Sequence, residues 1–283
     1  MKWNFFQMFT PQNTKPITWL ASYPKSGNTW VRAILFSGLT GSCDINRLGD
    51  VVPSFRNAVK KVQSAKNQQE MNNNAAFFWG MAQRRAAFDL GGKQIVFKTH
   101  IAALKYEGEQ FPIENVTRRV IYVARDPRDV IFSYANHYDL SKQQALENIE
   151  NQNNAIVDIA NKEFEFISSW GQHVTSWLAL KQPKLIIKYE DLEKDTVTVI
   201  RRLFDFMEIK PLIGCEEIAE QTSFQKLKNQ EKKSGFVESV NKKSFFNKGK
   251  SKQWKNSSEA GLRKLTKQTL EAMKLLGYQP NNE

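Results

Sequence analysis

The chain has 283 residues and a formal net charge of +12 at pH 7, from 41 Lys and Arg against 29 Asp and Glu. Hydrophobic residues make up 41% of it and aromatic residues 12%, which excludes fibrous, collagen-like and fully disordered proteins. Two cysteines, Cys43 and Cys215, are too few for a disulfide framework and match no spaced metal motif, which indicates a reducing compartment. The positive charge fits a nucleic-acid surface, an anionic membrane surface or a site for a small polyanion.

The N-terminal segment lacks the continuous apolar stretch of a signal peptide. No later run approaches the ~20 apolar residues of a membrane span. We therefore expect a cytoplasmic protein with no membrane span.

Short apolar runs alternate with amphipathic stretches along the chain. This pattern predicts an α/β fold, with a central, mostly parallel sheet flanked by helices. The predicted strands are residues 17–22, 94–98, 119–124 and 185–189.

Helices are predicted after two of these strands and in the C-terminal half. A tight loop over residues 23–28 leads into a helix that contains Trp30, and a turn over residues 125–129 precedes a helix that begins near Val130. The remaining expectations are helices and loops over residues 44–92, a helix with an aromatic face from Phe164 to Trp177, and helices over residues 193–207 and 258–276.

Residues 226–255 carry ten lysines against two glutamates, Glu231 and Glu238. Such a run is typical of a solvated or mobile segment. A loop that closes over an anion is the alternative, because the run also contains two glycines and four aromatic residues: Gly235, Gly249, Phe236, Phe245, Phe246 and Trp254.

The loop Lys25-Ser26-Gly27-Asn28-Thr29 has the parts of a phosphate or sulfate site at a helix N-terminus, namely a lysine, hydroxyls and backbone N–H donors. It does not fit the Walker A spacing, because Lys25 precedes Gly27 and no upstream glycine is present. An ordinary P-loop nucleoside triphosphatase is therefore disfavoured. The alternative is a plain turn that joins strand to helix.

A second cluster follows the 119–124 strand. Arg125 and Ser133 offer a fork of donors and a hydroxyl, which together suit a phosphate monoester. The alternative is a capped helix with structural ion pairs made by Arg128 and Asp129.

A third cluster, Lys98-Thr99-His100, lies at the end of the 94–98 strand, where parallel sheets bind their ligands. A histidine there is suited to act as a general base, since its reference pKa of ~6.5 lies near working pH. Lys98 could stabilise developing negative charge. The alternative is a histidine that only packs.

These three peptides match one family in order and separation. Tyr23-Pro24-Lys25-Ser26-Gly27-Asn28-Thr29-Trp30 resembles the 5′-phosphosulfate loop of the cytosolic sulfotransferases, which usually has a threonine at the position of Asn28. Arg125-Asp126-Pro127-Arg128-Asp129-Val130-Ile131-Phe132-Ser133-Tyr134 is similar to the family's 3′-phosphate motif, and Lys98-Thr99-His100 stands where the family has its catalytic histidine. With shorter similarities downstream, the resemblance covers about residues 17–256.

The resemblance implies one domain over residues 1–283 with the P-loop-like sulfotransferase fold. Its basic segment, about residues 226–256, would be a lid that binds the donor. The implied activity is transfer of a sulfuryl group from 3′-phosphoadenosine 5′-phosphosulfate (PAPS) to a hydroxyl or amine of a small-molecule acceptor, with 3′-phosphoadenosine 5′-phosphate (PAP) as product. No metal and no nucleic-acid partner are implied.

By the same resemblance, His100 would be the general base, and Lys25 and Lys98 would stabilise charge during transfer. The implied donor site consists of Lys25, Ser26, Gly27, Asn28, Thr29, Trp30, Arg125, Ser133, Tyr189, Thr222, Phe224, Lys248 and Gly249.

The sequence departs from the family in two places. Asn247 replaces the arginine of an R-K-G motif, so either Lys248 or Lys250 takes over its phosphate contact or the donor binds more weakly. The positions that align with the family's dimer motif lack its Thr, Val and Glu, so a dimer of the family type is not expected: Lys255, Glu259, Ala260 and Lys264.

Two other functions compete with this interpretation. A nucleotide kinase with an atypical phosphate loop would need a magnesium carboxylate, and Arg125 with Ser133 speaks against it. A nucleic-acid-binding protein would use the basic run and its interleaved aromatics. The acceptor is not specified, and its pocket is expected to include parts of residues 44–92, 137–162 and 230–247.

Overall fold

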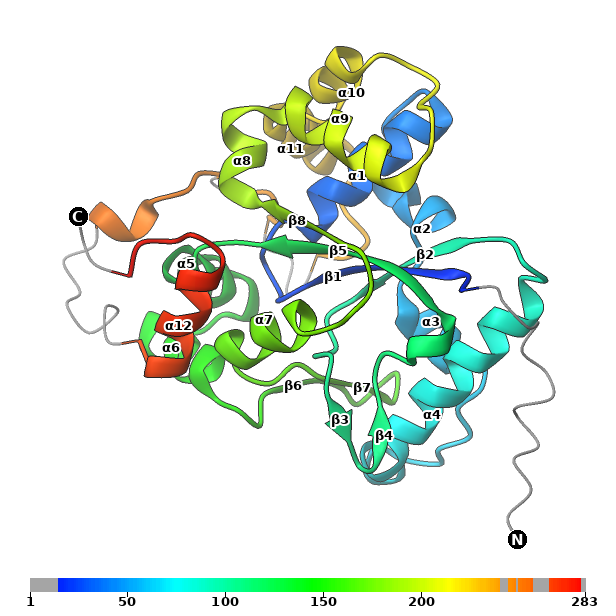
Figure 1. Cartoon of the computed structure of the whole chain (residues 1–283). Helices are drawn as coiled ribbons and strands as arrows, with labels where there is room; N and C mark the ends of the chain where they lie inside the picture. The colour runs from blue at the N-terminus through cyan, green and yellow to red at the C-terminus, as the bar shows by residue number, and fades with distance from the viewer. Residues whose placement is uncertain (1–14, 240–243, 248, 257–264, 281–283) are drawn as a thin grey trace, which may run out of the picture.

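A four-stranded sheet forms the centre of the computed structural model, which describes residues 15–239, 244–247, 249–256 and 265–280 (Figure 1). All neighbouring strands of this sheet are parallel. Its strand order is β2 (Ile95–Thr99), β1 (Ile17–Ser22), β5 (Thr117–Ala124) and β8 (Lys184–Lys188). Every residue of β1 is buried, as expected for a central parallel strand covered on both faces.

Successive residues of β1 enter two different cores, because side chains alternate between the faces of a strand. Trp19 and Ala21 pack into the larger core, and Leu20 packs into the other. The larger core contains α3 (Phe55–Lys60), α4 (Gln68–Asp89), α5 (Pro127–Tyr138), α6 (Lys142–Glu150), α7 (Trp170–Leu178) and α12 (Lys267–Leu275). The second contains α1 (Asn28–Thr40), α2 (Leu48–Val51), α8 (Tyr189–Lys194), α9 (Thr196–Met207), α10 (Cys215–Gln221) and α11 (Phe224–Ser234).

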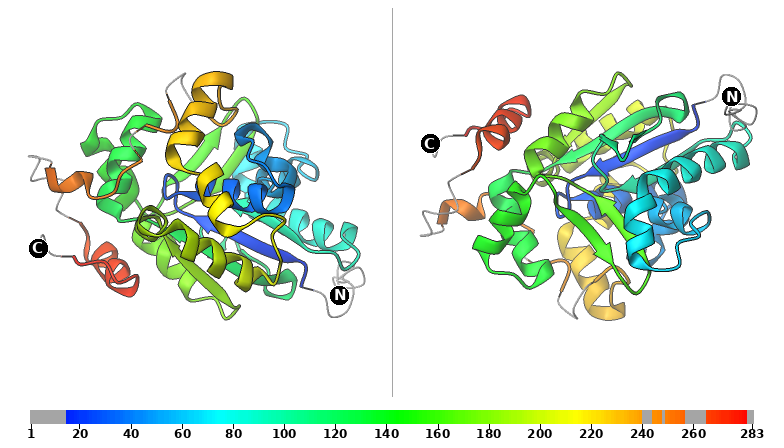
Figure 2. Two further views of the ribbon diagram at one scale, coloured as in Figure 1. Left: turned by 90° about the horizontal axis from the view of Figure 1, so that it is seen from above. Right: turned by 90° about the horizontal axis from the view of Figure 1, so that it is seen from below.

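The two sets of helices cover opposite faces of the sheet, as the views from above and below show (Figure 2). Short elements complete the described residues. They are the hairpins β3–β4 (Lys105–Tyr106, Glu109–Gln110) and β6–β7 (Ala155–Asp158, Glu163–Phe166), and the 3₁₀ turns η2 (Ile45–Arg47), η3 (Glu114–Val116) and η4 (Gln253–Asn256).

The predicted fold class, an α/β fold with a central parallel sheet flanked by helices, is confirmed. All four predicted strands are present: β1 has the predicted bounds, the other three differ by one or two residues, and Tyr189 opens α8 instead of ending β8. The predicted 193–207 helix is two helices, because Asp195 caps the start of α9 by accepting a hydrogen bond from the Thr198 amide at 3.0 Å.

One helix prediction is wrong in its first half. Phe164 and Phe166 lie in β7, where they alternate with glutamates and pair with β6, so their period is two. The helix begins only after Ser169, whose side chain caps α7 by accepting from the Gln172 amide. The predicted 258–276 helix is observed as α12, whereas residues 257–264 lie outside the described residues.

Among the helices of the described residues, none is both long enough and apolar enough to cross a membrane.

Candidate functional site

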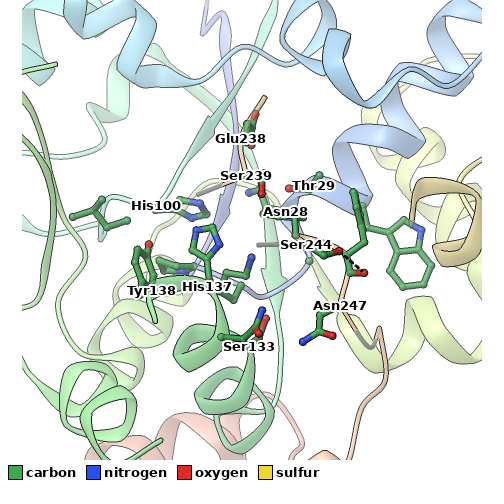
Figure 3. A pocket seen from close by; sticks show the side chains of 18 of the residues that line it. Asn28, Thr29, His100, Ser133, His137, Tyr138, Glu238, Ser239, Ser244 and Asn247 are labelled. Carbon is green, nitrogen blue, oxygen red and sulfur yellow. Dashed lines mark hydrogen bonds between the residues drawn. The ribbon is translucent and has the colours of Figure 1, made fainter. Parts of the chain in front are cut away.

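A cavity of about 1220 Å³ opens at the carboxyl ends of the four parallel strands (Figure 3). The segments that follow β1, β2, β5 and β8 all line it, which is the usual ligand position in such sheets. They contribute Lys25, His100, Arg125 and Tyr189, and the end of β2 contributes Lys98. The three predicted clusters therefore meet in one place, together with residues of α5, the β6–β7 hairpin and the basic segment.

The loop after β1 has the backbone shape of an anion cradle. Lys25 has φ 67° and Gly27, which caps α1, has φ 106°. A Cβ at Gly27 would lie 2.9 Å from Cδ2 of Tyr189, so both the backbone angle and the close approach require glycine. Helix α1 begins with Asn28 and Thr29, which both line the cavity. The first N–H groups of a helix have no partner within it, so those of α1 lie at this wall of the cavity.

Asn28 ties this loop to the end of β1. Its Nδ2 donates to the Leu20 carbonyl and to Oγ of Ser22, both at 3.2 Å. Oγ of Ser26 is buried without a hydrogen-bond partner, and the Ser26 side chain is not among the residues that line the cavity. The asparagine that replaces the family's threonine thus has a structural role through its amide.

Lys25 lies in an apolar, positively charged setting. Its Nζ is 3.6 Å from the ring centroid of Phe245, a cation–π contact with the basic segment. Burial, and then the charge of Arg125, lower the pKa of Lys25 to about 7. The lysine therefore gains a proton readily when an anion enters the cavity.

His100 is held in one tautomer by the backbone. Its Nδ1 lies 2.7 Å from the Ser22 carbonyl oxygen, which can only accept, so Nδ1 carries the proton and Nε2 keeps its lone pair. Burial, followed by the charge of Lys98, holds the pKa of His100 well below its ordinary value. The imidazole is thus neutral and can accept a proton at Nε2.

Lys98 lines the same cavity as His100. Its pKa is lowered by burial and by the charge of Arg56, and raised by the carboxylates of Glu238 and Glu165. Two lysines, Lys98 at the end of β2 and Lys25 after the neighbouring strand β1, therefore line the same cavity as His100.

Arg125 spans the cavity floor between two segments of the chain. Its guanidinium lies 4.1 Å from the Tyr189 ring centroid, and it donates to the carbonyls of Lys25 at 3.4 Å and Lys250 at 3.0 Å. Its Nε is buried with no hydrogen-bond partner. Ser133, on α5, lines the same cavity, so the predicted pair of a guanidinium and a hydroxyl is brought together.

Of the two neighbouring charged residues, Arg128 makes the ion pair that the structural alternative predicts, and Asp129 binds backbone amides. Arg128 makes a bidentate ion pair with Asp126 and lies over the Trp254 ring at 3.6 Å. Asp129 accepts from the amides of Lys252 at 2.6 Å and Gln253 at 2.8 Å. Burial raises the pKa of Asp129 to about 6, against the opposing charge of Arg125.

A family model described as the sulfotransferase domain matches residues 15–277. The chain belongs to the sulfotransferase family. The predicted family and enzyme class are therefore confirmed.

Known sulfotransferases cover most of the chain. Flavonol 3-sulfotransferase of Flaveria bidentis is 29% identical over 266 residues, which are 84% of this chain and 75% of that protein. Sulfotransferase 1E1 of Mus musculus is 26% identical over 272 residues, 92% of this chain and 83% of that protein. The structure of mouse sulfotransferase SULT7A1 complexed with PAP matches with a TM-score of 0.57 at 19% identity, covering 95% of this chain and 88% of that one, which confirms the predicted sulfotransferase fold.

Most residues that the sequence suggests for the donor site line the cavity of this sulfotransferase, including Trp30, Tyr189 and Phe224. Gly249 also lines it, with φ 64°, and a Cβ there would lie 2.4 Å from the Phe224 ring. Thr222 is not among the lining residues, and its hydroxyl donates to the Ile218 carbonyl of its own helix at 2.7 Å.

Lys248 lies outside the described residues. So do Glu259, Ala260 and Lys264, three of the positions that align with the family's dimer motif. Lys250 presents its carbonyl to Arg125, and its side chain is exposed and not among the lining residues.

Several residues around the cavity were not indicated by any local motif. His137 lines it, and burial together with the charges of Lys25 and Lys98 lowers the pKa of His137 to about 3. Glu238 lines it and pairs at 2.5 Å with Arg32, a buried residue of α1. His137 and Glu238 both fall within segments expected to contribute to the acceptor pocket, residues 137–162 and 230–247, although no motif singled them out.

In the described parts of the chain, no three His, Cys, Asp or Glu side chains gather closely enough to hold a metal ion.

Proposed function

We propose that this sulfotransferase uses PAPS as donor and His100 as general base to transfer a sulfuryl group to a hydroxyl or amine of a small-molecule acceptor. One observation carries the proposal: the unprotonated Nε2 of a neutral His100 shares a cavity with two lysines and the N-terminus of α1. Structures of the same fold complexed with PAP, mouse sulfotransferase SULT7A1 and retinol dehydratase, support the choice of donor.

In this mechanism His100 takes the proton of the acceptor hydroxyl at Nε2 while the acceptor oxygen attacks sulfur in line with the leaving oxygen. The bond between sulfur and the 5′-phosphate oxygen breaks, and its electron pair leaves with PAP. Lys98 stabilises the sulfuryl oxygens. Lys25 and the loop amides stabilise the 5′-phosphate, where charge develops as the bond to sulfur breaks.

The rest of the donor would follow the walls of the cavity. Arg125 and Ser133 would bind the 3′-phosphate, and the buried Arg125 Nε without a partner fits an incoming phosphate oxygen. Trp30, Tyr189 and Phe224 would surround the adenine, with Thr222 behind them. Lys248 and Gly249 would close over the 3′-phosphate side.

The wider assignments belong to the same proposal. The basic segment, residues 226–256, acts as a donor-binding lid of a single catalytic domain over residues 1–283. The acceptor is a small molecule, since relatives of this chain are named for flavonol and for luciferin. A cytoplasmic location is proposed because related plant proteins are named cytosolic sulfotransferases.

Calorimetric titration tests the donor directly. PAP, ATP and a short oligonucleotide are titrated in turn at two salt concentrations. One tight site for PAP and weak binding of ATP are expected. Tighter binding of the oligonucleotide with a steep salt dependence would favour a nucleic-acid binder, and tight magnesium-dependent ATP binding would favour a kinase. Sulfuryl transfer from labelled PAPS to a panel of alcohols and phenols then tests the reaction itself.

A further inference from the structure

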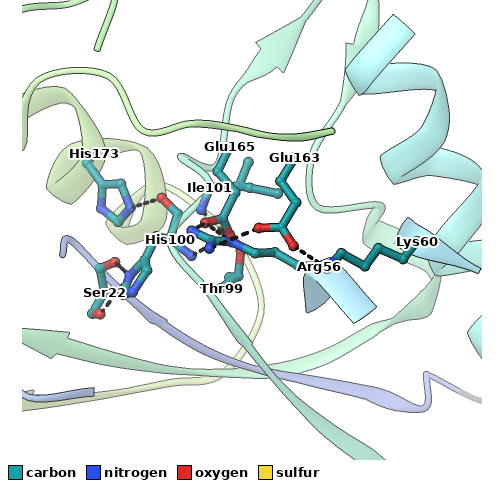
Figure 4. A network of polar contacts seen from close by, with 9 residues as sticks. All are labelled: Ser22, Arg56, Lys60, Thr99, His100, Ile101, Glu163, Glu165 and His173. Atoms are coloured by element: carbon teal, nitrogen blue, oxygen red, sulfur yellow. Dashed lines mark hydrogen bonds and ion pairs between the residues drawn. The ribbon is translucent and has the colours of Figure 1, made fainter. Parts of the chain in front are cut away.

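An ion pair with a buried carboxylate lies beside His100, on the side away from Ser22 (Figure 4). Glu165, on β7, is only 2% exposed, and its carboxylate is held by Nε of Arg56 at 2.6 Å and by Nη2 of the same guanidinium. Its other oxygen, Oε1, accepts from the backbone amide of His100 at 3.5 Å. The carboxylate therefore joins the base to a side chain of α3.

Arg56 is itself fixed from the opposite side. Its Nη1 donates to Glu163 at 3.2 Å, and Glu163 pairs with Lys60 at 2.7 Å. Two of the three guanidinium nitrogens are thus used on Glu165 and the third on Glu163. Arg56 is 25% exposed and lines the cavity.

The segment around His100 is anchored at its other atoms too. The His100 carbonyl accepts from Nε2 of His173 at 3.1 Å, and the imidazole Nδ1–H donates to the Ser22 carbonyl. Two residues further on, the Ala102 amide donates to the Phe166 carbonyl of β7 at 2.9 Å, so the strand that carries Glu165 runs beside this segment.

An ion pair with a buried partner is weak evidence for a stabilising role. The desolvation of two charges largely offsets their attraction, and apolar side chains of similar volume often stabilise a fold as well or better. The carboxylate of this pair, however, accepts a hydrogen bond from the backbone amide of His100, the residue whose ring must keep a fixed orientation. Its geometry therefore has a use in positioning that packing alone would not supply.

We propose that Arg56 and Glu165 are positioning residues for His100: Glu165 binds the His100 amide, Arg56 fixes Glu165, and together they keep the imidazole Nδ1–H on the Ser22 carbonyl with Nε2 toward the acceptor. The inference rests on the proposed role of His100 as base. It adds that the orientation and tautomer of the ring depend on a charge pair from α3 and β7.

The test uses Glu165→Gln and Arg56→Met, with Glu163→Gln as matched control. Glu163→Gln also removes one carboxylate charge that pairs with Arg56. Among the described contacts, however, Glu163 has no hydrogen bond to His100. For the first two variants kcat is expected to fall about 10–100-fold, as when the outer partner of a functional histidine is lost. Affinity for PAP stays within about threefold, and the control loses less kcat than either.

Imidazole ¹⁵N spectra supply a readout that a loss of general stability would not move. The chain has only three histidines, so the His100 signals are assignable by substitution of His137 and His173. Wild-type His100 is expected as the Nδ1–H tautomer, and the two variants as a mixture of tautomers. Arg56→Met is the second arm because Arg56 is partly exposed, so this variant remains informative if Glu165→Gln fails to fold.

Two results would overturn the inference: kcat within about threefold of wild type in both variants, or a pure Nδ1–H tautomer of His100 in both. The spectra do not depend on turnover. If wild type shows no transfer from PAPS, the proposed function fails, whereas the tautomer comparison still decides whether Arg56 and Glu165 hold the ring.

Discussion

Two regions enclose the cavity and are held in place by different means. The loop cradle, residues 22–30 with His100 and Arg125, lies where parallel strands end, and strand pairing and burial fix its backbone. The basic segment, residues 226–256, is tied down by carboxylates that accept hydrogen bonds from its backbone amides. Glu231, on the α11 part of the segment itself, accepts from Phe245 and Phe246, whereas Asp129 of α5 accepts from Lys252 and Gln253, and Glu193 of α8 accepts from Ser251.

The two regions therefore differ in how a substitution can alter them. The cradle cannot be altered without disturbing the sheet, except at the side chains that face the cavity. The basic segment can be loosened at one carboxylate at a time. Substitutions in the cradle are therefore expected to act on chemistry and affinity strongly, and those at the ties to act weakly and through the segment's position.

The largest effect is expected for His100→Ala. Turnover should fall about 10²–10⁴-fold, the usual contribution of a general base, while the affinity for PAP stays close to that of wild type. Single-turnover transfer and PAP titration measure the two quantities separately. Near-normal transfer by this variant would remove His100 from the role of base.

Arg125→Ala comes next, because a charge-assisted hydrogen bond contributes about 1.5–3 kcal/mol. The affinity for PAP is expected to fall about 10–150-fold, with a similar fall for Lys25→Ala. Lys250→Ala is the control from the basic segment, since only its carbonyl meets Arg125. A loss at Lys250 as large as that at Arg125 would mean that its side chain takes over the phosphate contact missing at Asn247.

A smaller effect concerns pH. With a pKa of about 7 in the empty cavity, Lys25 is charged below pH 7 and neutral above it, and a bound anion raises that pKa. The affinity for PAP should therefore be full below pH 7 and fall by up to about tenfold for each pH unit above it, until the pKa of the complex is reached. Lys25→Arg keeps its charge throughout and should flatten the curve. An equally steep decline in that variant would assign the titration to another group.

The smallest effect is expected at a carboxylate that binds backbone amides of the basic segment. Glu231→Gln keeps one acceptor oxygen but removes the charge that holds the amides of Phe245 and Phe246. The KM for PAPS should rise about 3–10-fold with kcat nearly unchanged, as for loss of one charged hydrogen-bond acceptor at a partly exposed site. Glu220→Gln, an exposed partner of Lys226, is the matched control. Equal kinetics of the two variants would mean that the tie does not position the segment.

The sequence predicted what depends on local pattern. Apolar runs identify all four sheet strands, and the loop from Lys25 to Thr29 identifies the helix start that faces the cavity. The sequence could not predict contacts between distant segments. Arg56 and Glu165 are 109 residues apart and belong to no motif. They pair only because the packing of the folded chain brings α3 and β7 together.

Two other features were also beyond the sequence. The tautomer of His100 follows from a carbonyl 78 residues away. The period of two at Phe164 and Phe166 became clear only from the partner strand β6, because four residues are too few to separate a strand from the helix that follows.

The central place of β1 in the sheet also bears on the order in which the protein folds. Trp19 pairs with Phe97 and with Val120, 78 and 101 residues further along the chain, so two long loops must close before the cradle exists. PAP should then bind only after the barrier to folding has been crossed, slowing unfolding and leaving the refolding rate unchanged in stopped-flow experiments. Faster refolding with PAP present would show that the cradle forms before the sheet is complete. For this chain, donor binding is thus expected to lengthen the lifetime of the native state without guiding its formation.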